Sequence, residues 1–118
     1  MNVHFVTLRT EDLEKSIAFY SRVLGMTVAR RFAPRPGMEI VFMDGGGIEV
    51  EFVFDGNPVP PPAGVSLGFF VDDMDKILAH LGRESVEILA GPDTMPNGVR
   101  LLRARDCHGL ELGFVQQP

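Results

Sequence analysis

Three glutamates occupy positions in this sequence whose spacing suggests binding chemistry. Glu49 and Glu51 stand with one residue between them in the segment Gly47–Phe54, where apolar and polar residues alternate. Successive side chains of a β-strand leave opposite faces of the sheet, so both carboxylates point to one face. Glu111 has the place of Glu49 in a second, similar segment, Gly109–Val115. Carboxylates on a sheet face can bind a cation, accept hydrogen bonds from a ligand, or act as a base.

The repeated strand belongs to a longer repeat, and its first copy predicts a strand, a helix and three more strands. Strands are expected at Val3–Arg9, Thr27–Phe32, Met38–Asp44 and Gly47–Phe54. Between the first two strands, apolar side chains recur every three or four residues, as on one side of a helix, at Leu13, Ile17, Tyr20 and Leu24. Thr10 or Asp12 can cap this helix, and Gly25 can end it. Prolines and a glycine make the stretch from Arg30 to Gly37 an expected exposed turn.

The second half of the chain predicts the same order of elements. Strands are expected at Val65–Val71, Val86–Ala90, Val99–Ala104 and Gly109–Val115, with a turn region at Gly91–Gly98. Asp72 or Asp73 can cap the second helix, which closes at Gly82 and carries Met74, Ile77, Leu78 and Leu81. The two helix starts are separated along the chain by almost the same number of residues as the two terminal strands. This agreement predicts tandem βαβββ modules and an α+β fold.

Proline and glycine concentrate between the two predicted modules. Residues 56–64 include Pro58, Pro60, Pro61 and Pro62, and proline lacks the backbone donor that an internal strand needs. A length of 118 residues is typical of one domain. We therefore expect a single domain, residues 1–118, made of modules at about residues 1–55 and 65–118 and joined by this linker.

Composition and charge argue against several classes of protein. A net charge of −5 without a basic stripe argues against nucleic-acid binding and mildly favours a neutral or cationic ligand. Cys107 is the only cysteine, so no disulfide can form within the chain, which favours a reducing compartment. The N-terminus lacks a signal-peptide pattern, and no apolar run approaches the roughly 20 residues of a membrane span. We expect a soluble, cytoplasmic protein that binds neither nucleic acid nor membrane.

Two motifs carry a resemblance to a known family. The segment Leu8–Tyr20, continuing through Val23-Leu24-Gly25-Met26, is similar to the helix that follows the first strand throughout the vicinal oxygen chelate superfamily. The turn Asp106-Cys107-His108-Gly109 resembles that superfamily's Asp-Pro-Asp-Gly turn, with two substitutions. The superfamily includes glyoxalase I, extradiol dioxygenases and drug-binding proteins of the bleomycin-resistance type. The resemblance implies two curved sheets, each covered by a helix, that together line a cleft, and it implies a homodimer.

Metal-using members of this superfamily place a ligand on the first and last strand of each module. The corresponding positions here are Phe5, Glu51, Ser66 and Gly113, with Glu49 as an alternative to Glu51. Phe5 has no donor atom, Gly113 has no side chain, and Ser66 is a poor ligand for a divalent ion. Only one conventional donor is left, so we expect no metal and no other cofactor. Glu51 is the best candidate for a catalytic base if the protein is an enzyme.

The three histidines and the cysteine are not expected to complete a site. His4 precedes a ligand position by one residue and therefore faces the other side of its strand, unless a β-bulge turns it back. His80 lies late on the second helix, near the negative end of its dipole. His108 and Cys107 are neighbours in a turn, where adjacent side chains diverge.

The side chains expected to contact a ligand are aromatic, small or polar and share the inferred concave face: Phe5, Thr7, Arg9, Glu49, Glu51, Ser66, Gly68, Phe70 and Glu111. Aromatic walls, room beside small residues and a few polar groups are typical of a small-molecule site. If Arg9 neutralises only one glutamate, the face has surplus negative charge and suits a cationic or hydrogen-bond-donating molecule with a flat, aromatic part. Alternatively, Arg9 and the glutamates neutralise one another on a solvated face that binds nothing.

Three functions therefore remain open. The first is a metal-free binding protein of the bleomycin-resistance type that holds a small organic molecule. The second is a metal-dependent lyase, isomerase or dioxygenase resembling glyoxalase I, with unusual donors such as Glu49, Glu51, Glu111 and His4. The third is a non-catalytic interaction module that keeps the fold as a dimer scaffold. The missing ligands place the binding protein first.

Overall fold

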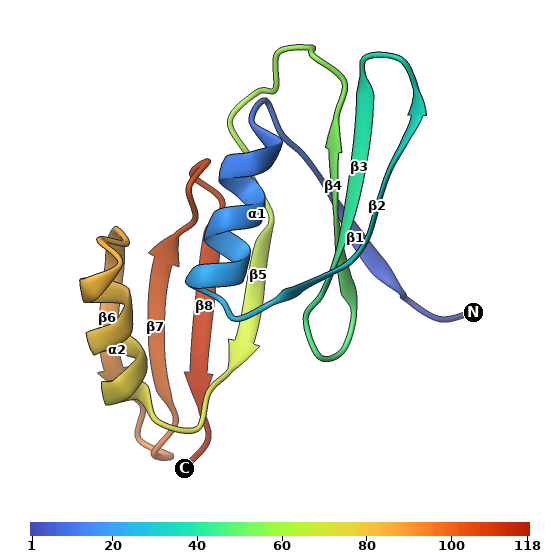
Figure 1. Ribbon diagram of the computed structural model, residues 1–118. Coiled ribbons are helices and arrows are strands. Elements are labelled where there is room, and N and C mark those ends of the chain that lie inside the picture. The colour runs from blue at the N-terminus through green and yellow to red at the C-terminus, as the bar shows by residue number, and fades with distance from the viewer. The chain divides into compact units, whose positions relative to one another are not determined.

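The chain forms two compact units, Met1–Pro60 and Pro61–Pro118, in a computed structural model that describes all 118 residues. Each unit has one helix and four strands in the order βαβββ (Figure 1). The predicted α+β class and the tandem βαβββ repeat are therefore confirmed. Neither helix is long and apolar enough to cross a membrane.

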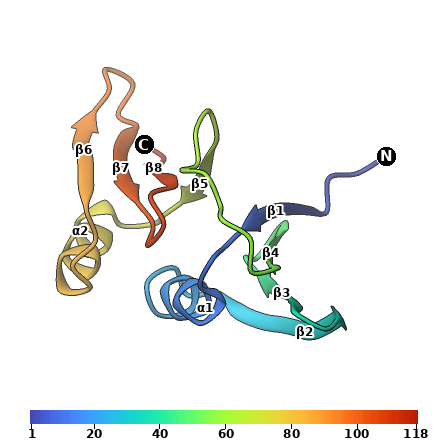
Figure 2. The ribbon, with the colours of Figure 1, turned by 90° about the horizontal axis from the view of Figure 1, so that it is seen from above.

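The first module is a four-stranded sheet in the order β1-β4-β3-β2. Its elements are β1 (Phe5–Arg9), α1 (Leu13–Arg22), β2 (Thr27–Arg35), β3 (Met38–Asp44) and β4 (Glu49–Phe54). Strand β1 runs parallel to β4, and the other pairs are antiparallel. Helix α1 lies along one face of the sheet and leaves the other face without a helix (Figure 2).

Local sequence signals fix both ends of α1. The Asp12 side chain accepts a hydrogen bond from the Lys15 backbone at 3.1 Å, so Asp12 rather than Thr10 is the N-cap. Thr10 is buried, and its hydroxyl lies 2.9 Å from that of Ser16. After the helix, Gly25 adopts a φ of 72°, the left-handed conformation that favours glycine at a helix end.

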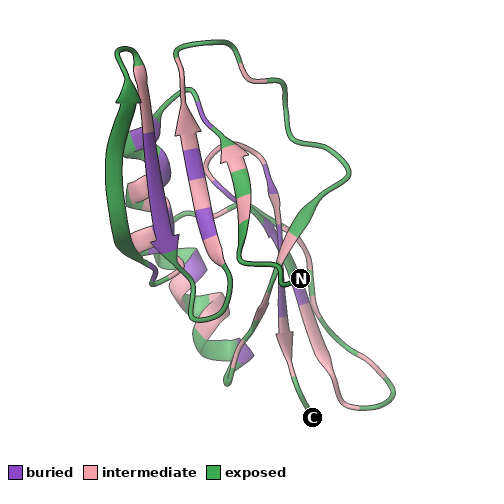
Figure 3. Cartoon of the chain, turned by 90° about the vertical axis from the view of Figure 1, so that its right-hand side faces the viewer, coloured by how far each residue is buried: buried purple, intermediate pink, exposed green.

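The core of the first module lies between α1 and the sheet. Tyr20 is fully buried, and its ring meets that of Phe52 edge-on with centroids 4.8 Å apart. Strand β3 is buried along most of its length, whereas every residue of its neighbour β2 is exposed (Figure 3). An outer strand beside a buried one is typical of a sheet edge.

The expected turn from Arg30 to Gly37 is wrong for most of its length. Strand β2 continues to Arg35, and only Pro36 and Gly37 form the turn. Pro34 lies at a register shift between Phe32 and Arg35 in a strand that pairs only with β3. A missing backbone donor costs little at such an edge, so the proline does not end the strand.

The second module repeats this topology with the order β5-β8-β7-β6. Its elements are β5 (Ser66–Phe70), α2 (Met74–Arg83), β6 (Ile88–Thr94), β7 (Arg100–Arg105) and β8 (Glu111–Gln116). Strand β5 runs parallel to β8, as β1 does to β4. Asp73 caps α2 through the backbone of Lys76, at 3.2 Å, which matches the role of Asp12.

Two predicted boundaries in the second module are wrong. Helix α2 does not close at Gly82 but continues to Arg83, and Ser85 takes the left-handed conformation, with a φ of 57°. The first half of the expected turn Gly91–Gly98 is strand, because β6 extends to Thr94, and only residues 95–98 lie outside the strands. Like β2, β6 is an edge strand with register shifts, where glycine and proline are tolerated.

Candidate functional site

The first module gathers five of the predicted site residues on the sheet face opposite α1. Phe5 pairs with Glu49 and Thr7 with Glu51 in the parallel β1–β4 ladder, so these side chains stand side by side on one face. Arg9 lies further along β1 on the same face. The prediction that these five side chains share one sheet face is therefore correct.

Glu51 is the acid on this face that no arginine neutralises. Its Oε1 accepts a hydrogen bond of 2.5 Å from the Thr7 hydroxyl. The residue is half-buried, and β3 places the ring of Phe42 directly across the ladder from it. An ionised carboxylate offers about four lone-pair sites, so Glu51 keeps acceptor capacity for a ligand.

Glu49 is paired instead with Arg30 of β2. Both guanidinium Nη atoms donate to the two carboxylate oxygens at 3.0 Å each. The same guanidinium carbon lies 4.0 Å from the centre of the Phe42 ring. This two-point geometry fixes the arginine plane as well as its position.

Arg9 does not contact any of the candidate glutamates. Its Nη2 pairs with Asp55 at 2.5 Å. The pKa of Asp55 is below its ordinary value because the Asn57 backbone N–H donates to the carboxylate, with a further contribution from Arg9. The expected role of Arg9 as the cation that neutralises a glutamate is wrong, and the surplus charge is smaller than expected: Arg30 neutralises Glu49, so of the two glutamates on β4 only Glu51 lacks an arginine partner.

Three phenylalanine rings cluster on the sheet face that carries Glu51. The Phe5 ring meets Phe42 edge-on, with centroids 5.4 Å apart and an interplanar angle of 83°. Phe32 stacks on Phe42 with centroids 6.4 Å apart. Phe5 and Phe32 remain 48% and 44% exposed, so the face presents apolar ring surface beside a carboxylate. That combination is typical of sites for small organic molecules.

The second module carries the remaining predicted residues on its corresponding face. Ser66 pairs with Glu111 across β5 and β8, and Gly68 pairs with Gly113. Phe70 ends β5 and is 77% exposed. Two facing glycines leave this sheet without side chains where Thr7 and Glu51 stand in the first module. The face is therefore flatter and poorer in polar groups.

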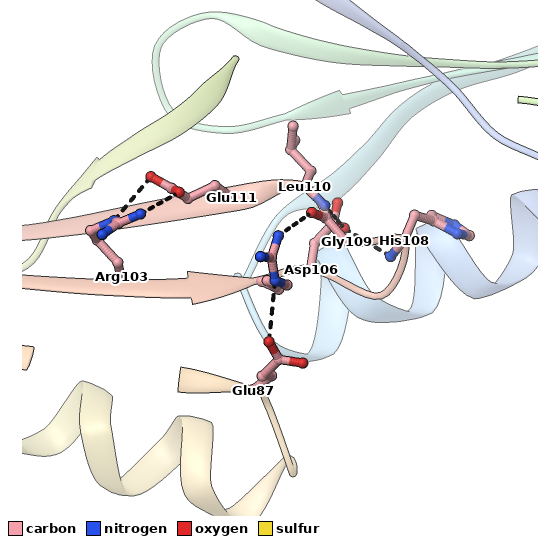
Figure 4. A network of polar contacts seen from close by, with 8 residues as sticks. Glu87, Arg103, Asp106, His108, Gly109, Leu110 and Glu111 are labelled. Carbon is pink, nitrogen blue, oxygen red and sulfur yellow. Dashed lines mark hydrogen bonds and ion pairs between the residues drawn. The ribbon is translucent and has the colours of Figure 1, made fainter. Parts of the chain in front are cut away.

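Glu111 forms a two-point ion pair with Arg103 of β7 (Figure 4). The arginine Nε and Nη2 donate to the carboxylate at 3.1 and 2.7 Å. This pairing lowers the pKa of Glu111 and raises that of Arg103. Glu111 is therefore already satisfied and offers a ligand less than Glu51 does.

Backbone hydrogen bonds to a buried carboxylate hold the turn between β7 and β8 in shape. The buried Asp106 carboxylate accepts hydrogen bonds from the backbone of His108, at 2.8 Å, and of Leu110, at 2.9 Å (Figure 4). Cys107 is half-buried within this turn and forms no disulfide. His4 is exposed just before β1, and His80 lies in the last turn of α2. His4 precedes the residues of β1 that pair with β4, and His80 and His108 belong to the second module.

The residues at the family's metal-ligand positions do not fit a divalent ion. Within its module, Glu51 is next to a phenylalanine and a threonine, and Gly113 faces Gly68. The structure brings together no group of three or more His, Cys, Asp and Glu side chains that could hold a metal. A stable site needs three or four converging donors.

Two open hollows in the first module lie away from this face. One, of about 660 Å³, is lined by Ala33–Glu39 and Phe54. The other, of about 300 Å³, is lined by Leu24–Thr27 and Asp44–Gly46. Neither includes Glu51 or its aromatic neighbours, so neither contributes to the candidate site.

Sequence reasoning missed three residues that shape these faces. Arg30 was assigned to the expected turn, although its alternation with Phe32 places both on one face of a strand. Phe42 lies in the run Ile40–Met43, where apolar residues on both faces hide the alternation. Arg103 alternates with two buried neighbours, Leu102 and Ala104, and this signal was available.

Two βαβββ modules, each with a helix on one face of its sheet, are typical of one large superfamily of proteins. The family model for the glyoxalase/bleomycin resistance protein/dioxygenase superfamily matches residues 2–114, so the chain belongs to this superfamily. The resemblance drawn from the α1 motif and the β7–β8 turn is confirmed. No curated protein sequence matches the chain.

Solved structures with the same fold come from several organisms. The chain is similar to TioX from Micromonospora sp. ML1, with a TM-score of 0.78, 21% identity and 100% of both chains covered. It is also similar to the trypanothione-dependent glyoxalase I of Leishmania major, with a TM-score of 0.83 and 21% identity over 99% of this chain and 87% of that one. A superfamily member from Sphaerobacter thermophilus has a TM-score of 0.72 and 24% identity, over 99% and 98% of the two chains. At these identities the likeness shows the fold.

Proposed function

We propose that this protein binds a small organic molecule, without a metal, through the helix-free face of its first module. The observation that carries the proposal is Glu51, a half-buried carboxylate held by Thr7, without an arginine partner, beside exposed phenylalanine rings. A polar acceptor that is oriented but not neutralised is suited to a ligand's donor group. The second module contributes less to binding, because its glutamate, Glu111, is already paired with Arg103.

The ligand that suits this face has a flat aromatic part and a hydrogen-bond donor or a positive charge. The aromatic part would contact Phe5 and Phe32, which are exposed on the same sheet. The donor or charge would meet Glu51. Since Glu49 is neutralised by Arg30, the attraction for a cation rests on a single carboxylate.

The test is calorimetric titration of ligands found by a thermal-shift screen. Glu51→Gln removes the charge and keeps the shape, and should weaken binding by roughly tenfold to a hundredfold, because a hydrogen bond to a charged group contributes about 1.5–3 kcal/mol. Glu49→Gln should weaken binding less, and raised salt should weaken binding of a cationic ligand. Glu111→Gln is the matched control in the second module. Binding unchanged by Glu51→Gln would overturn the proposal.

The second candidate is a metal-dependent lyase, isomerase or dioxygenase resembling glyoxalase I, with Glu51 as the donor or base. Its support is that Glu51 stands at a ligand position of the superfamily. Elemental analysis separates the two functions: protein purified without chelators should contain well under one equivalent of zinc, nickel, manganese or iron. Near-stoichiometric metal that is lost in Glu51→Ala would favour the enzyme.

A further inference from the structure

Arg30 offers a flat, fixed cationic surface on the helix-free face of the first module. One side of its guanidinium lies over Phe42, with the central carbon 4.0 Å from the ring centre. Its edge is held by two hydrogen bonds of 3.0 Å to Glu49. The side chain nevertheless remains 51% exposed, so the guanidinium side turned away from Phe42 is open. A guanidinium fixed in this way loses little freedom when a second ring stacks on it.

Resting on the proposed function, we propose that Arg30 determines specificity by stacking against the ring of the ligand. The attraction between a guanidinium and a ring arises from the negative charge of the ring face, so it favours neutral, electron-rich arenes. An electron-poor ring is attracted less, and a cationic ring is repelled by the positive charge of the guanidinium. The ligand class is therefore a neutral, electron-rich arene with a hydroxyl or N–H donor for Glu51, rather than a flat cation.

The register of the sheet places the two groups at a suitable separation. Arg30 and Glu51 both pair with Phe42, one from β2 and the other from β4. Two strand spacings separate their backbones by about 9–10 Å. A two-ring arene stacked on Arg30 over the Phe42 position can therefore direct its hydroxyl group towards Glu51.

The second module supplies an internal control. Arg103 makes the same two-point pair with a glutamate but occupies the strand position that corresponds to Phe42, across from Gly113. No ring centre lies within cation–π distance of its guanidinium in the structure, whereas Arg30 rests on one. If stacking on a ring-supported guanidinium determines specificity, substitution of Arg103 should have no effect on binding.

The experiment compares two probes of similar size, 2-naphthol and N-methylquinolinium, by NMR titration of the intact protein. We expect 2-naphthol to bind more tightly and to shift the Arg30 side-chain protons upfield, as protons above a ring face are. Arg30→Lys, which keeps the charge but not the plane, should weaken 2-naphthol binding about two- to fivefold. Arg103→Lys should leave binding unchanged. Melting temperatures verify that both variants fold.

The failure of this inference is distinct from failure of the proposed function. Binding that depends on Glu51 but is unchanged by Arg30→Lys would overturn the role of Arg30 alone, and so would tighter binding of N-methylquinolinium. The absence of the upfield shift in the wild-type protein would also overturn it, whatever the stability of the variants. Binding of neither probe, or binding unaffected by Glu51→Gln, would overturn the proposed function with it.

Discussion

The two modules keep the same glutamate–arginine pair but take the arginine from different strands. In the first, Glu49 of β4 pairs with Arg30, which β2 supplies from beyond the Phe42 ring. In the second, Glu111 of β8 pairs with Arg103 on β7, at the position that corresponds to Phe42. The equivalent carboxylate can therefore be neutralised from the adjacent strand, as by Arg103, or from the edge strand beyond it, as by Arg30. The choice decides whether an aromatic ring remains on that face.

A second difference concerns the residues that remain available to a ligand. The first module has Thr7 and Glu51 side by side, where the second has Gly68 and Gly113. Duplication has thus given one face with a polar acceptor among rings and another with bare backbone. We interpret the face of the first module as the binding face. The corresponding face of the second module then serves as an internal control for substitutions in the first.

The largest expected effect comes from the eighth residue of each helix, Tyr20 in α1 and Leu81 in α2, both essentially fully buried. Tyr20→Ala should cost about 3–5 kcal/mol of unfolding free energy, because it removes the ring packed on Phe52. Leu81→Ala should cost about 2–5 kcal/mol. Urea unfolding followed by circular dichroism measures both.

The shape of these transitions tests whether the modules fold as one unit. If they do, both variants give a single transition with a lowered midpoint. Two separated transitions, with only the mutated module shifted, would show that each module is stable alone. A loss below about 1 kcal/mol for Tyr20→Ala would contradict the core described for the first module.

Two glycines of the second module should respond in opposite directions to alanine. Gly91 has a φ of 90°, and an added Cβ would lie 2.5 Å from the Leu101 carbonyl oxygen, so Gly91→Ala should destabilise by at least about 1–3 kcal/mol. At Gly113 an added Cβ meets only the Leu67 oxygen at 3.9 Å. Gly113→Ala should therefore be neutral or stabilising by about 0.5–1 kcal/mol, as for a glycine replaced within a strand.

Gly113→Ala also tests why the face of the second module has no side chains at the position that corresponds to Glu51. If Gly113→Ala is tolerated in thermal melts, the backbone does not require glycine where the first module has Glu51. Strong destabilisation by Gly113→Ala would instead mean that the backbone excludes side chains there, and the two faces would differ for structural reasons.

Much of this comparison was predictable from sequence because alternation and capping are local signals. The strand Met38–Asp44 was predicted with both of its observed ends, and Asp12 and Asp73 cap their helices. The placement of Glu49 and Glu51 on one face of β4, and of Phe5, Thr7 and Arg9 on one face of β1, followed from the two-residue period of strands. Such inferences require nothing beyond the residue's neighbours in the chain.

The wrong predictions concern strand ends and ion-pair partners, which depend on contacts with residues distant in the chain. Pro34 looks like the end of a strand, yet an edge strand needs no donor at that point, and only the sheet order reveals which strand is at the edge. The partners of Glu49 and Glu111 are arginines on neighbouring strands, and pairing across strands depends on register. The charge of the face was misjudged for that reason, although the glutamates were correctly placed.

The smallest expected effect is the pH dependence contributed by Glu111, whose pKa is lowered mainly by its hydrogen bonds to Arg103. A carboxyl whose pKa is lower in the folded state stabilises the fold above its unfolded pKa, roughly 4.3, and this contribution is lost as the pH falls through the folded value. Glu111→Gln should therefore lower the melting temperature slightly at pH 7, by a few degrees at most, since exposed ion pairs contribute little. The difference from the wild-type protein should vanish well below pH 4 and shrink in 0.5 M salt. In the first module, Glu39→Gln should behave alike, because Arg31 lowers the pKa of Glu39 in the same way. A melting difference for Glu111→Gln that grows on acidification would mean that its pairing with Arg103 does not stabilise the second sheet.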